Sequence, residues 1–185
     1  MATLAAENAI KPKGKEGIVK LPLSTSGYFP DGSSIVRVER LPWTPFNLVG
    51  SDEGSVFKLL SVLWNHDMFT MILDVPGGLT VEPHYHLGEA HGYIMTGGFD
   101  YEYGDIAAGD YLAEGDNIAH SAQLGDEHTL QFSLIFGGLC GVLPDGGPDL
   151  ASKIGCMEVY QMAKANNAAG HIIPPPPGWR SKWPG

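Results

Sequence analysis

Short apolar runs separated by turn residues fill the middle of the chain. Residues 56–64 (VFKLLSVLW) and 68–75 (MFTMILDV) predict two strands, with a turn at 65–67 between them. Further runs of the same kind occur at 79–81, 92–95, 99–103, 111–113 and 129–136. Strands this short, with a turn about every eight to twelve residues, are typical of an all-β sandwich or barrel.

The regions on either side of these runs follow a different pattern. Prolines and glycines interrupt residues 17–49 so often that only short strands fit between them. One helical stretch is predicted within residues 150–169. The tail at 174–185 (PPPPGWRSKWPG) begins as polyproline II and carries two tryptophans, which are costly to leave in water. The tail is therefore either a flexible end or a segment packed over the barrel mouth or a neighbouring subunit.

Composition supports one all-β domain. With 185 residues, 43% of them hydrophobic, the chain can fill one core, and its 25 Gly and 14 Pro favour tight turns over helices. We therefore predict a flexible N-terminal arm (1–16), a single domain (17–173) and a Pro/Trp-rich C-terminal tail (174–185). Cys140 and Cys156 have no paired spacing, so a reduced compartment, two buried thiols or a disulfide would each explain them.

The net charge narrows the choice of partners. A formal charge of −10 repels phosphate backbones and anionic lipids, so we expect neither nucleic acid nor a membrane as a partner. No run reaches about 18 uninterrupted apolar residues, so no transmembrane helix is expected. Residues 1–9 lack the basic and apolar regions of a signal peptide, and a cytoplasmic protein is the expectation.

Histidines are the main candidates for chemistry. Side chains alternate along a strand, so His84 and His86 must point to the same side, with Tyr85 opposite. Two imidazoles on one face, roughly 6–7 Å apart along the strand, can converge on one metal ion. His120 follows further strands and turns, and in a barrel it could return to the same place.

The spacing around these histidines resembles the two sequence motifs of the cupin superfamily, G(X)5HXH(X)3–4E(X)6G and G(X)5PXG(X)2H(X)3N. The residues that match are Gly78, His84, His86, Gly98, Gly109 and His120. This resemblance implies a cupin fold, which is a double-stranded β-helix or jelly-roll-like barrel with few short helices. It also implies that His84, His86 and His120 bind a metal ion.

The chain departs from the motifs at four positions. His91 stands where the first motif has Glu, and Gly115, Asn117 and Leu124 stand where the second has Pro, Gly and Asn. Gly and Asn can both form tight turns, so these two changes keep the turn. The change at His91 implies a site without a carboxylate. His91 is then either a fourth ligand or a group that hydrogen-bonds substrate or bound water.

Strand alternation also gives candidate pocket residues. Tyr93 and Met95 share the parity of His91, so they are expected to face the barrel interior. Phe99 and Tyr101 are placed inside as well, and a buried phenol needs a hydrogen-bond partner that a substrate could supply. The remaining histidines are expected to be exposed: His66, His128 and His171.

Residues 84–99 (HYHLGEAHGYIMTGGF) look most similar to the group containing dihydroxyacetophenone dioxygenase and acetylacetone dioxygenase. That resemblance implies an iron(II) enzyme that uses O2 to cleave a C–C bond in a small diketone or aryl hydroxyketone. Imidazole ligands also suit other ions, so zinc, manganese and nickel stay open.

Two other classes of function remain open for this fold. One is a redox-neutral, metal-dependent lyase or isomerase, and the other is a non-catalytic cupin that binds a small molecule. A homo-oligomer is also expected. Trp43 and Phe46 lie in a run broken by prolines, and a partner would cover them better than water.

Overall fold

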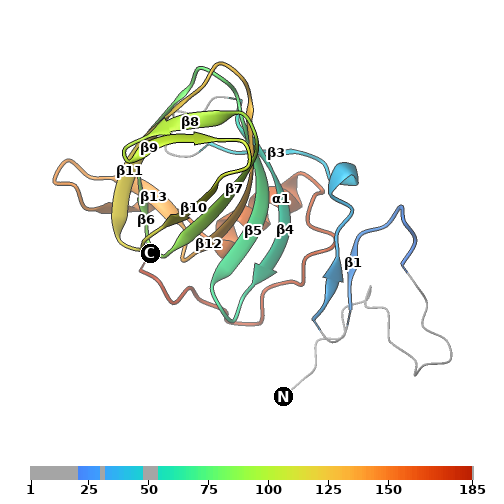
Figure 1. Cartoon of the computed structure of the whole chain (residues 1–185). Coiled ribbons are helices and arrows are strands. Elements are labelled where there is room, and N and C mark those ends of the chain that lie inside the picture. Colours follow the sequence, from blue (N-terminus) through green and yellow to red (C-terminus); the bar gives the residue numbers. More distant parts are fainter. Residues whose placement is uncertain (1–20, 30–31, 48–53, 185) are drawn as a thin grey trace.

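Two six-stranded antiparallel sheets pack face to face and form a barrel (Figure 1). The computed structural model describes residues 21–29, 32–47 and 54–184. Sheet 1 has the strand order β10-β7-β12-β5-β4-β3, and sheet 2 has the order β14-β13-β6-β11-β8-β9. The predicted all-β barrel is therefore confirmed, whereas the predicted arm at 1–16 lies outside the described residues.

The bounds of the elements are as follows. Sheet 1 consists of β3 (Thr44–Pro45), β4 (Val56–Leu63), β5 (Met68–Val75), β7 (Ala90–Thr96), β10 (Tyr111–Glu114) and β12 (Thr129–Phe136). Sheet 2 consists of β6 (Thr80–His86), β8 (Gly98–Tyr101), β9 (Gly104–Ala107), β11 (Ile118–Leu124), β13 (Leu139–Val142) and β14 (Pro148–Ile154). Outside the two sheets lie β1 (Gly27–Tyr28), β2 (Ser34–Ile35), the 3-10 helix η1 (Val38–Arg40) and the helix α1 (Cys156–Ala165).

The helix α1 lies within residues 150–169, where the sequence predicts one helical stretch. It begins after Gly155, whose backbone N–H donates to the Glu158 carboxylate at 2.9 Å and so satisfies one of the first free donors of the helix. It ends at Asn166, which is followed by Asn167 with a positive φ of 56°. Asparagine tolerates this left-handed conformation, which ends helices. Glycine and asparagine residues therefore set both ends.

The core lies between the sheets and beneath α1. Large side chains of β4 and β5 point inward and are fully or almost fully buried, among them Phe57, Leu59, Phe69 and Met71. Val159 and Ala163 of α1 join the same cluster. Phe46, which the sequence assigned to a partner interface, is only 2% exposed and packs edge-on against Phe57 in this core. Trp43 stays 39% exposed, with the Lys58 ammonium group 4.5 Å above its ring.

The C-terminal tail lies against its own barrel. The Trp179 indole donates to the backbone carbonyl of Trp64 at 2.8 Å, and the two rings pack edge to face. The buried carboxylate of Asp67 accepts hydrogen bonds from Ser181 Oγ at 2.5 Å and from the backbone N–H of Lys182 at 2.7 Å. These contacts favour the packed alternative for the tail over the flexible one.

Three smaller expectations can be compared with the structure. His171 is 3% exposed and its ring nitrogen bonds to the Leu59 carbonyl at 2.8 Å, so the expectation of an exposed His171 was wrong. Cys140 and Cys156 are free, buried thiols. Within the described part of the chain, no helix is long and apolar enough to cross a membrane.

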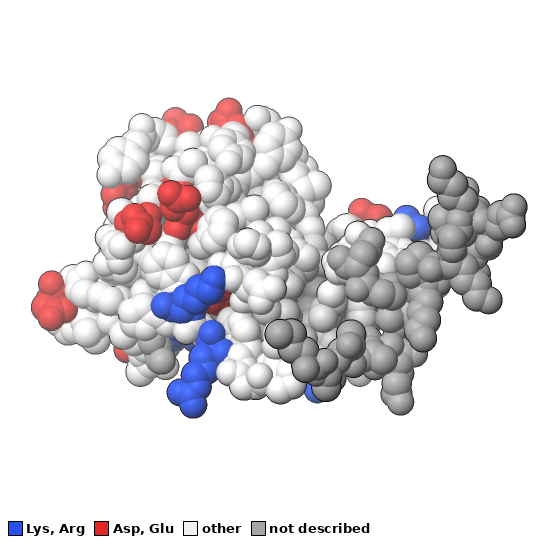
Figure 2. Space-filling view, turned by 90° about the horizontal axis from the view of Figure 1, so that it is seen from below, with Lys and Arg blue, Asp and Glu red and all other residues white. Residues whose placement is uncertain are grey.

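Charged side chains are scattered over one face of the molecule. Figure 2 shows Asp and Glu side chains scattered over the face seen from below, with a few Lys and Arg side chains nearer its middle. This distribution agrees with the net charge of −10.

Candidate metal centre

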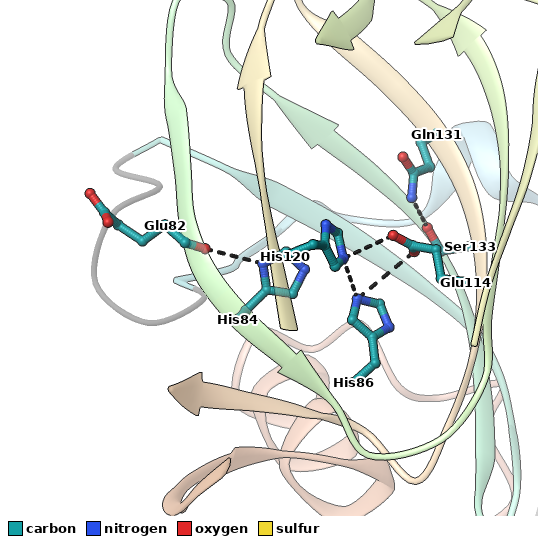
Figure 3. A network of polar contacts seen from close by, with 7 residues as sticks. All are labelled: Glu82, His84, His86, Glu114, His120, Gln131 and Ser133. Atoms are coloured by element: carbon teal, nitrogen blue, oxygen red, sulfur yellow. Dashed lines mark hydrogen bonds and ion pairs between the residues drawn. The ribbon is translucent and has the colours of Figure 1, made fainter. Parts of the chain in front are cut away.

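Three histidines from two adjacent strands meet inside the barrel (Figure 3). His84 and His86 lie on the same face of β6 and are 6% and 3% exposed. β11 pairs with β6 so that His120 stands directly opposite His84, which explains why a residue far along the chain reaches the same place. The ring centroids of His84 and His120 are 4.3 Å apart, and those of His86 and His120 are 4.8 Å apart.

The donor atoms fit a single metal ion. One nitrogen from each of His84, His86 and His120 lies within 4.8 Å of the other two. The Nε2 atoms of His86 and His120 are 2.8 Å apart, and two nitrogen lone pairs at this distance repel unless a proton or a cation lies between them. Two imidazoles bound to one ion at about 2.1 Å bring their nitrogens to about 3 Å at a right angle. This group could therefore hold a metal ion with little rearrangement.

The local contacts of His84 select the tautomer that binds metal. Its Nδ1 lies 3.1 Å from the backbone carbonyl of Glu82. A carbonyl oxygen can only accept, so Nδ1 carries the proton and Nε2 keeps its lone pair. The Nδ1 atoms of His86 and His120 are buried and have no hydrogen-bond partner among the residues that the structure describes.

Burial keeps two of the imidazoles neutral. Burial and the neighbouring His120 and His86 lower the pKa of His84 to about 3. Burial lowers the pKa of His86 to about 4, although the charge of Glu114 opposes this shift. Neutral imidazole is the form that coordinates metal ions, so near pH 7 these side chains are ready to bind.

Glu114 is a functional candidate that the sequence analysis missed. It ends β10, and its side chain is 10% exposed with Oε1 2.8 Å from His120 Nε2 and Oε2 3.8 Å from His86 Nε2. Burial disfavours its charged form, but the hydrogen bond with His120 and the nearby histidines lower its pKa overall. The expectation of a site without a carboxylate was therefore wrong, because Glu114 brings one from another strand.

Tyr101 extends this polar group. Its ring is 5% exposed and its centroid lies 5.0 Å from that of His120. Burial, and then the charge of Glu114 and a hydrogen bond with it, raise the pKa of Tyr101 well above its usual range. The phenol therefore stays protonated beside the Glu114 carboxylate.

His91 lies outside the three-histidine group. On β7 the residues that face the barrel are Ala90 and Ile94, which are 4% and 0% exposed, whereas His91 has the opposite parity. The His91 backbone pairs with Ala113 of β10, and its Nδ1 lies 2.6 Å from the Tyr111 hydroxyl. His91 borders the cavity described below, but its imidazole is directed to Tyr111 and not to the other histidines.

The pocket residues predicted from alternation divide into two pairs. Phe99 lines the cavity, and Tyr101 is buried beside His120, so both side chains face inward. Tyr93 and Met95 are 46% and 45% exposed and lie on the outer face of sheet 1, so their predicted inward orientation was wrong. The parity of β7 is shifted by one residue from the prediction, and the parity of β8 is not.

A small cavity of about 100 Å³ adjoins the three histidines and Glu114. Its walls are mainly apolar and include Leu73, Val75, Val81, Phe99, Leu112 and Leu124. Polar side chains other than the histidines and Glu114 come from one strand, β12, which contributes Thr129, Gln131 and Ser133. The arrangement is a group that could hold a metal ion at one end of a small, largely apolar chamber.

Residues 31–137, more than half of the chain, match the family model of the ChrR cupin-like domain. The chain therefore belongs to this cupin family, and the resemblance stated from the His84–His120 motifs is confirmed. No curated protein matches the chain.

Solved structures with the same fold include two that are named for one activity. A protein of Methylibium petroleiphilum PM1, provisionally named an acetylacetone dioxygenase, is 26% identical, with a TM-score of 0.63 and coverage of 70% of this chain and 92% of its own. The acetylacetone dioxygenase of Acinetobacter johnsonii is 21% identical, with a TM-score of 0.59 and coverage of 66% and 85%. An RmlC-like cupin of Ralstonia eutropha JMP134 is 19% identical, with a TM-score of 0.61 and coverage of 75% and 88%.

Proposed function

We propose that this protein is an iron(II) dioxygenase that cleaves a C–C bond in a small aliphatic 1,3-diketone with O2. The observation that carries the proposal is the buried group of His84, His86 and His120, with the Glu114 carboxylate beside it, at the end of a small apolar cavity. The similarity to the protein provisionally named an acetylacetone dioxygenase supports the choice of substrate class.

The metal supplies one part of the chemistry. Iron(II) held by His84, His86 and His120 would bind the two substrate oxygens and give O2 the electrons that zinc cannot give. The overall reaction balances when both atoms of O2 enter the products. A 1,3-diketone then loses one C–C bond and gives a carboxylic acid and a 2-oxoaldehyde.

Glu114 is the residue that we assign to proton transfer. A 1,3-diketone must lose the acidic proton between its carbonyl groups to become electron-rich. Glu114 is the carboxylate beside the histidine group, its lowered pKa keeps it ionised near pH 7, and it lies within 2.8 Å of His120. In this proposal the protonated phenol of Tyr101, which interacts with Glu114, orients the carboxylate.

The size of the cavity favours a diketone over an aryl hydroxyketone. The chamber beside the histidines has a volume of about 100 Å³. A small aliphatic diketone such as pentane-2,4-dione has fewer non-hydrogen atoms than a benzene ring that carries a hydroxyketone side chain. Of the two substrate classes implied by the sequence resemblance, the small diketone therefore needs less space.

The proposal is tested by reconstituting metal-free protein with iron(II) or with zinc and adding pentane-2,4-dione. We expect the iron protein to consume O2 in step with diketone loss, and the zinc protein to bind the diketone without turnover. Turnover by the zinc protein in the absence of O2 would replace the proposal with a redox-neutral lyase or isomerase. Binding without turnover by either form would favour a non-catalytic binding protein.

The metal ligands are tested separately from turnover. His86→Ala should remove most of the bound iron measured by elemental analysis, because an exchange of one of three ligands weakens binding strongly. His128→Ala is the matched control, because the His128 side chain is 68% exposed and pairs with Asp74 outside the cavity. Retention of iron in the His84, His86 and His120 alanine variants would contradict the ligand assignment.

A further inference from the structure

One wall of the cavity is more polar than its neighbours. On β12 alternate side chains face the chamber, and three of the four that do so are Thr129, Gln131 and Ser133. The adjacent strand β5 presents only apolar side chains to the same space. Thr129 is occupied elsewhere, since its hydroxyl donates to the Gly98 carbonyl and accepts from the Gly98 N–H, both at 3.0 Å.

Gln131 and Ser133 form a hydrogen-bonded pair that keeps further donors and an acceptor unpaired among the described residues. The Gln131 amide donates to Ser133 Oγ at 2.8 Å. Among the described residues nothing else pairs with the second amide N–H, the amide oxygen or the Ser133 hydroxyl hydrogen. Ser133 is 2% exposed, so its hydroxyl has little access to bulk water. A partly buried polar pair with two unused donors and one unused acceptor is suited to bind a ligand oxygen.

The absence of a side chain at Gly92 leaves space for the Gln131 amide. Gly92 of β7 pairs with Ser133, and a Cβ atom at Gly92 would lie 3.2 Å from Gln131 Nε2 and 3.4 Å from its Cδ. The missing side chain therefore leaves the space into which the amide folds over Ser133. Figure 3 shows Gln131 and Ser133 next to Glu114, on the side away from His84. The pair thus adjoins the end of the chamber where a chelated substrate would lie.

We propose that Gln131 and Ser133 bind a third oxygen of the substrate, a neutral hydroxyl or carbonyl that lies beyond the two oxygens facing the metal. This inference rests on the proposed function and narrows its substrate class to small diketones that carry a further oxygen. The oxygen is neutral because, among the described residues, the cavity lining contains no Lys or Arg that would pair with an anionic group.

Two ligands of nearly equal shape test the proposal. 1-Hydroxypentane-2,4-dione differs from hexane-2,4-dione only by a hydroxyl in place of a methyl group. We expect the zinc-loaded protein to bind the hydroxylated compound about tenfold more tightly in calorimetric titrations, as one hydrogen bond to an otherwise unpaired buried group would give. Equal binding, or tighter binding of hexane-2,4-dione, would overturn the proposal.

Two variants assign this preference to the pair. Gln131→Leu should abolish the preference, and Gly92→Ala should reduce it by displacing the amide, while both variants keep the bound zinc. Gln161→Leu is the matched control, because Gln161 is exposed on α1, and it should leave the preference unchanged. If Gln131→Leu still bound 1-hydroxypentane-2,4-dione more tightly than hexane-2,4-dione, another group would bind the third oxygen.

A metal-independent measurement separates this proposal from the proposed function. If neither diketone binds the zinc protein, chelation fails and the proposed function fails with it. The Gln131 side-chain amide signals, identified by their loss in Gln131→Leu, should still shift in the NMR spectrum of metal-free protein when cyclopentanone is added. Unchanged signals at saturating cyclopentanone would overturn the role of the pair on its own.

Discussion

Each side chain of the candidate metal centre depends on a different local partner. The Glu82 carbonyl fixes the tautomer of His84, burial keeps His86 neutral, and Glu114 contacts His120. A carboxylate beside three imidazoles lowers the net charge of the site when a divalent ion is bound and leaves one side of the ion open. These contacts make single substitutions informative, because each one removes a single function.

Glu114→Gln tests the assignment of the proton acceptor. The amide keeps the shape and the hydrogen bond from Tyr101 but cannot accept a proton, so kcat for pentane-2,4-dione should fall by about 10² to 10³. Iron content, measured alongside, should stay close to that of the parent protein. Glu102→Gln, at an exposed position next to Tyr101, serves as the control. An unchanged kcat in Glu114→Gln would remove Glu114 from the mechanism.

The lowered pKa values of His84 and His86 also predict how stability depends on pH. In the unfolded chain both imidazoles titrate near 6.5, whereas in the folded, metal-free protein they stay neutral down to about 3 and 4. Below pH 6.5 the unfolded chain therefore binds protons that the folded protein does not. The free energy of unfolding should fall as the pH drops from 6.5 toward 4, by up to about 1.4 kcal/mol per pH unit for each histidine.

Urea unfolding of the metal-free protein at several pH values measures this slope. The double variant His84→Ala, His86→Ala should show a flatter dependence over the same range, since the proton-binding difference is gone. A parent protein whose stability is constant between pH 6.5 and 4 would show that these imidazoles are not buried in their neutral form.

At the scale of single elements, the positions of the strands could be predicted from the sequence. The side of the sheet on which each side chain lies could be predicted only in part. β5 and β12 have the bounds that their apolar runs predicted, and His84 and His86 share a face as alternation requires. In β8, Phe99 and Tyr101 face inward because alternation starts afresh after the turn at Gly97. Periodicity alone therefore located most strands and one pair of candidate metal ligands.

The orientation of β7 could not be predicted from the chain alone. Pairing with β10 and β12 places Gly92 opposite Leu112 and Ser133, which turns His91 and Tyr93 outward. The motif comparison took His91 as an inward-facing residue and assigned the other residues of β7 by alternation from it. The predicted inward and outward faces of β7 were therefore exchanged. Glu114 escaped notice for a related reason, because it reaches His120 through strand pairing, and no motif position marks it.

The contact between the β4–β5 turn and the tail gives a prediction for these elements. Asp67 is fully buried, has a positive φ of 52°, and accepts two hydrogen bonds from Ser181 and Lys182. Asp67→Asn keeps a residue that tolerates this backbone conformation but removes the charge that strengthens both bonds. We expect a loss of about 1–3 kcal/mol in urea unfolding.

Hydrogen exchange shows where that loss acts. The backbone amide of Lys182 should lose protection in Asp67→Asn, while amides of β5 and β12 keep it, because the tail packs outside the sheets. Asp145→Asn, in an exposed turn, is the control. Full protection of Lys182 in Asp67→Asn would mean that Trp179 and Lys153 hold the tail without the carboxylate.

At the scale of the whole molecule, the outer face of sheet 1 stands out from an acidic surface. Tyr93 pairs with Phe132 on one side and with Tyr111 on the other, so three aromatic side chains lie in one row across β12, β7 and β10. Tyr93, Met95 and Tyr111 are 46%, 45% and 65% exposed. We call this row, together with Met95 and Leu134, the outer patch.

The net charge of the chain bears on which partner covers the outer patch. Two copies of a protein with a net charge of −10 repel each other wherever carboxylates face carboxylates. The outer patch contains no Asp or Glu, so it is a part of sheet 1 that a second copy can approach with less of that cost. We therefore expect the homo-oligomer contact on sheet 1, because Phe46 is buried in its own barrel.

We therefore predict a homodimer in solution that forms through the outer patch. Tyr93→Asp should convert it to a monomer in light scattering at micromolar concentration, because the substitution puts one buried charge on each side of the interface. Leu143→Asp is the matched control, because Leu143 is 43% exposed and directly follows β13, a strand of sheet 2. A monomeric parent protein, or a dimer that survives both Tyr93→Asp and Met95→Asp, would contradict this prediction. Because the patch lies on the opposite face of sheet 1 from Gln131 and Glu114, iron content should be the same in the monomeric variant.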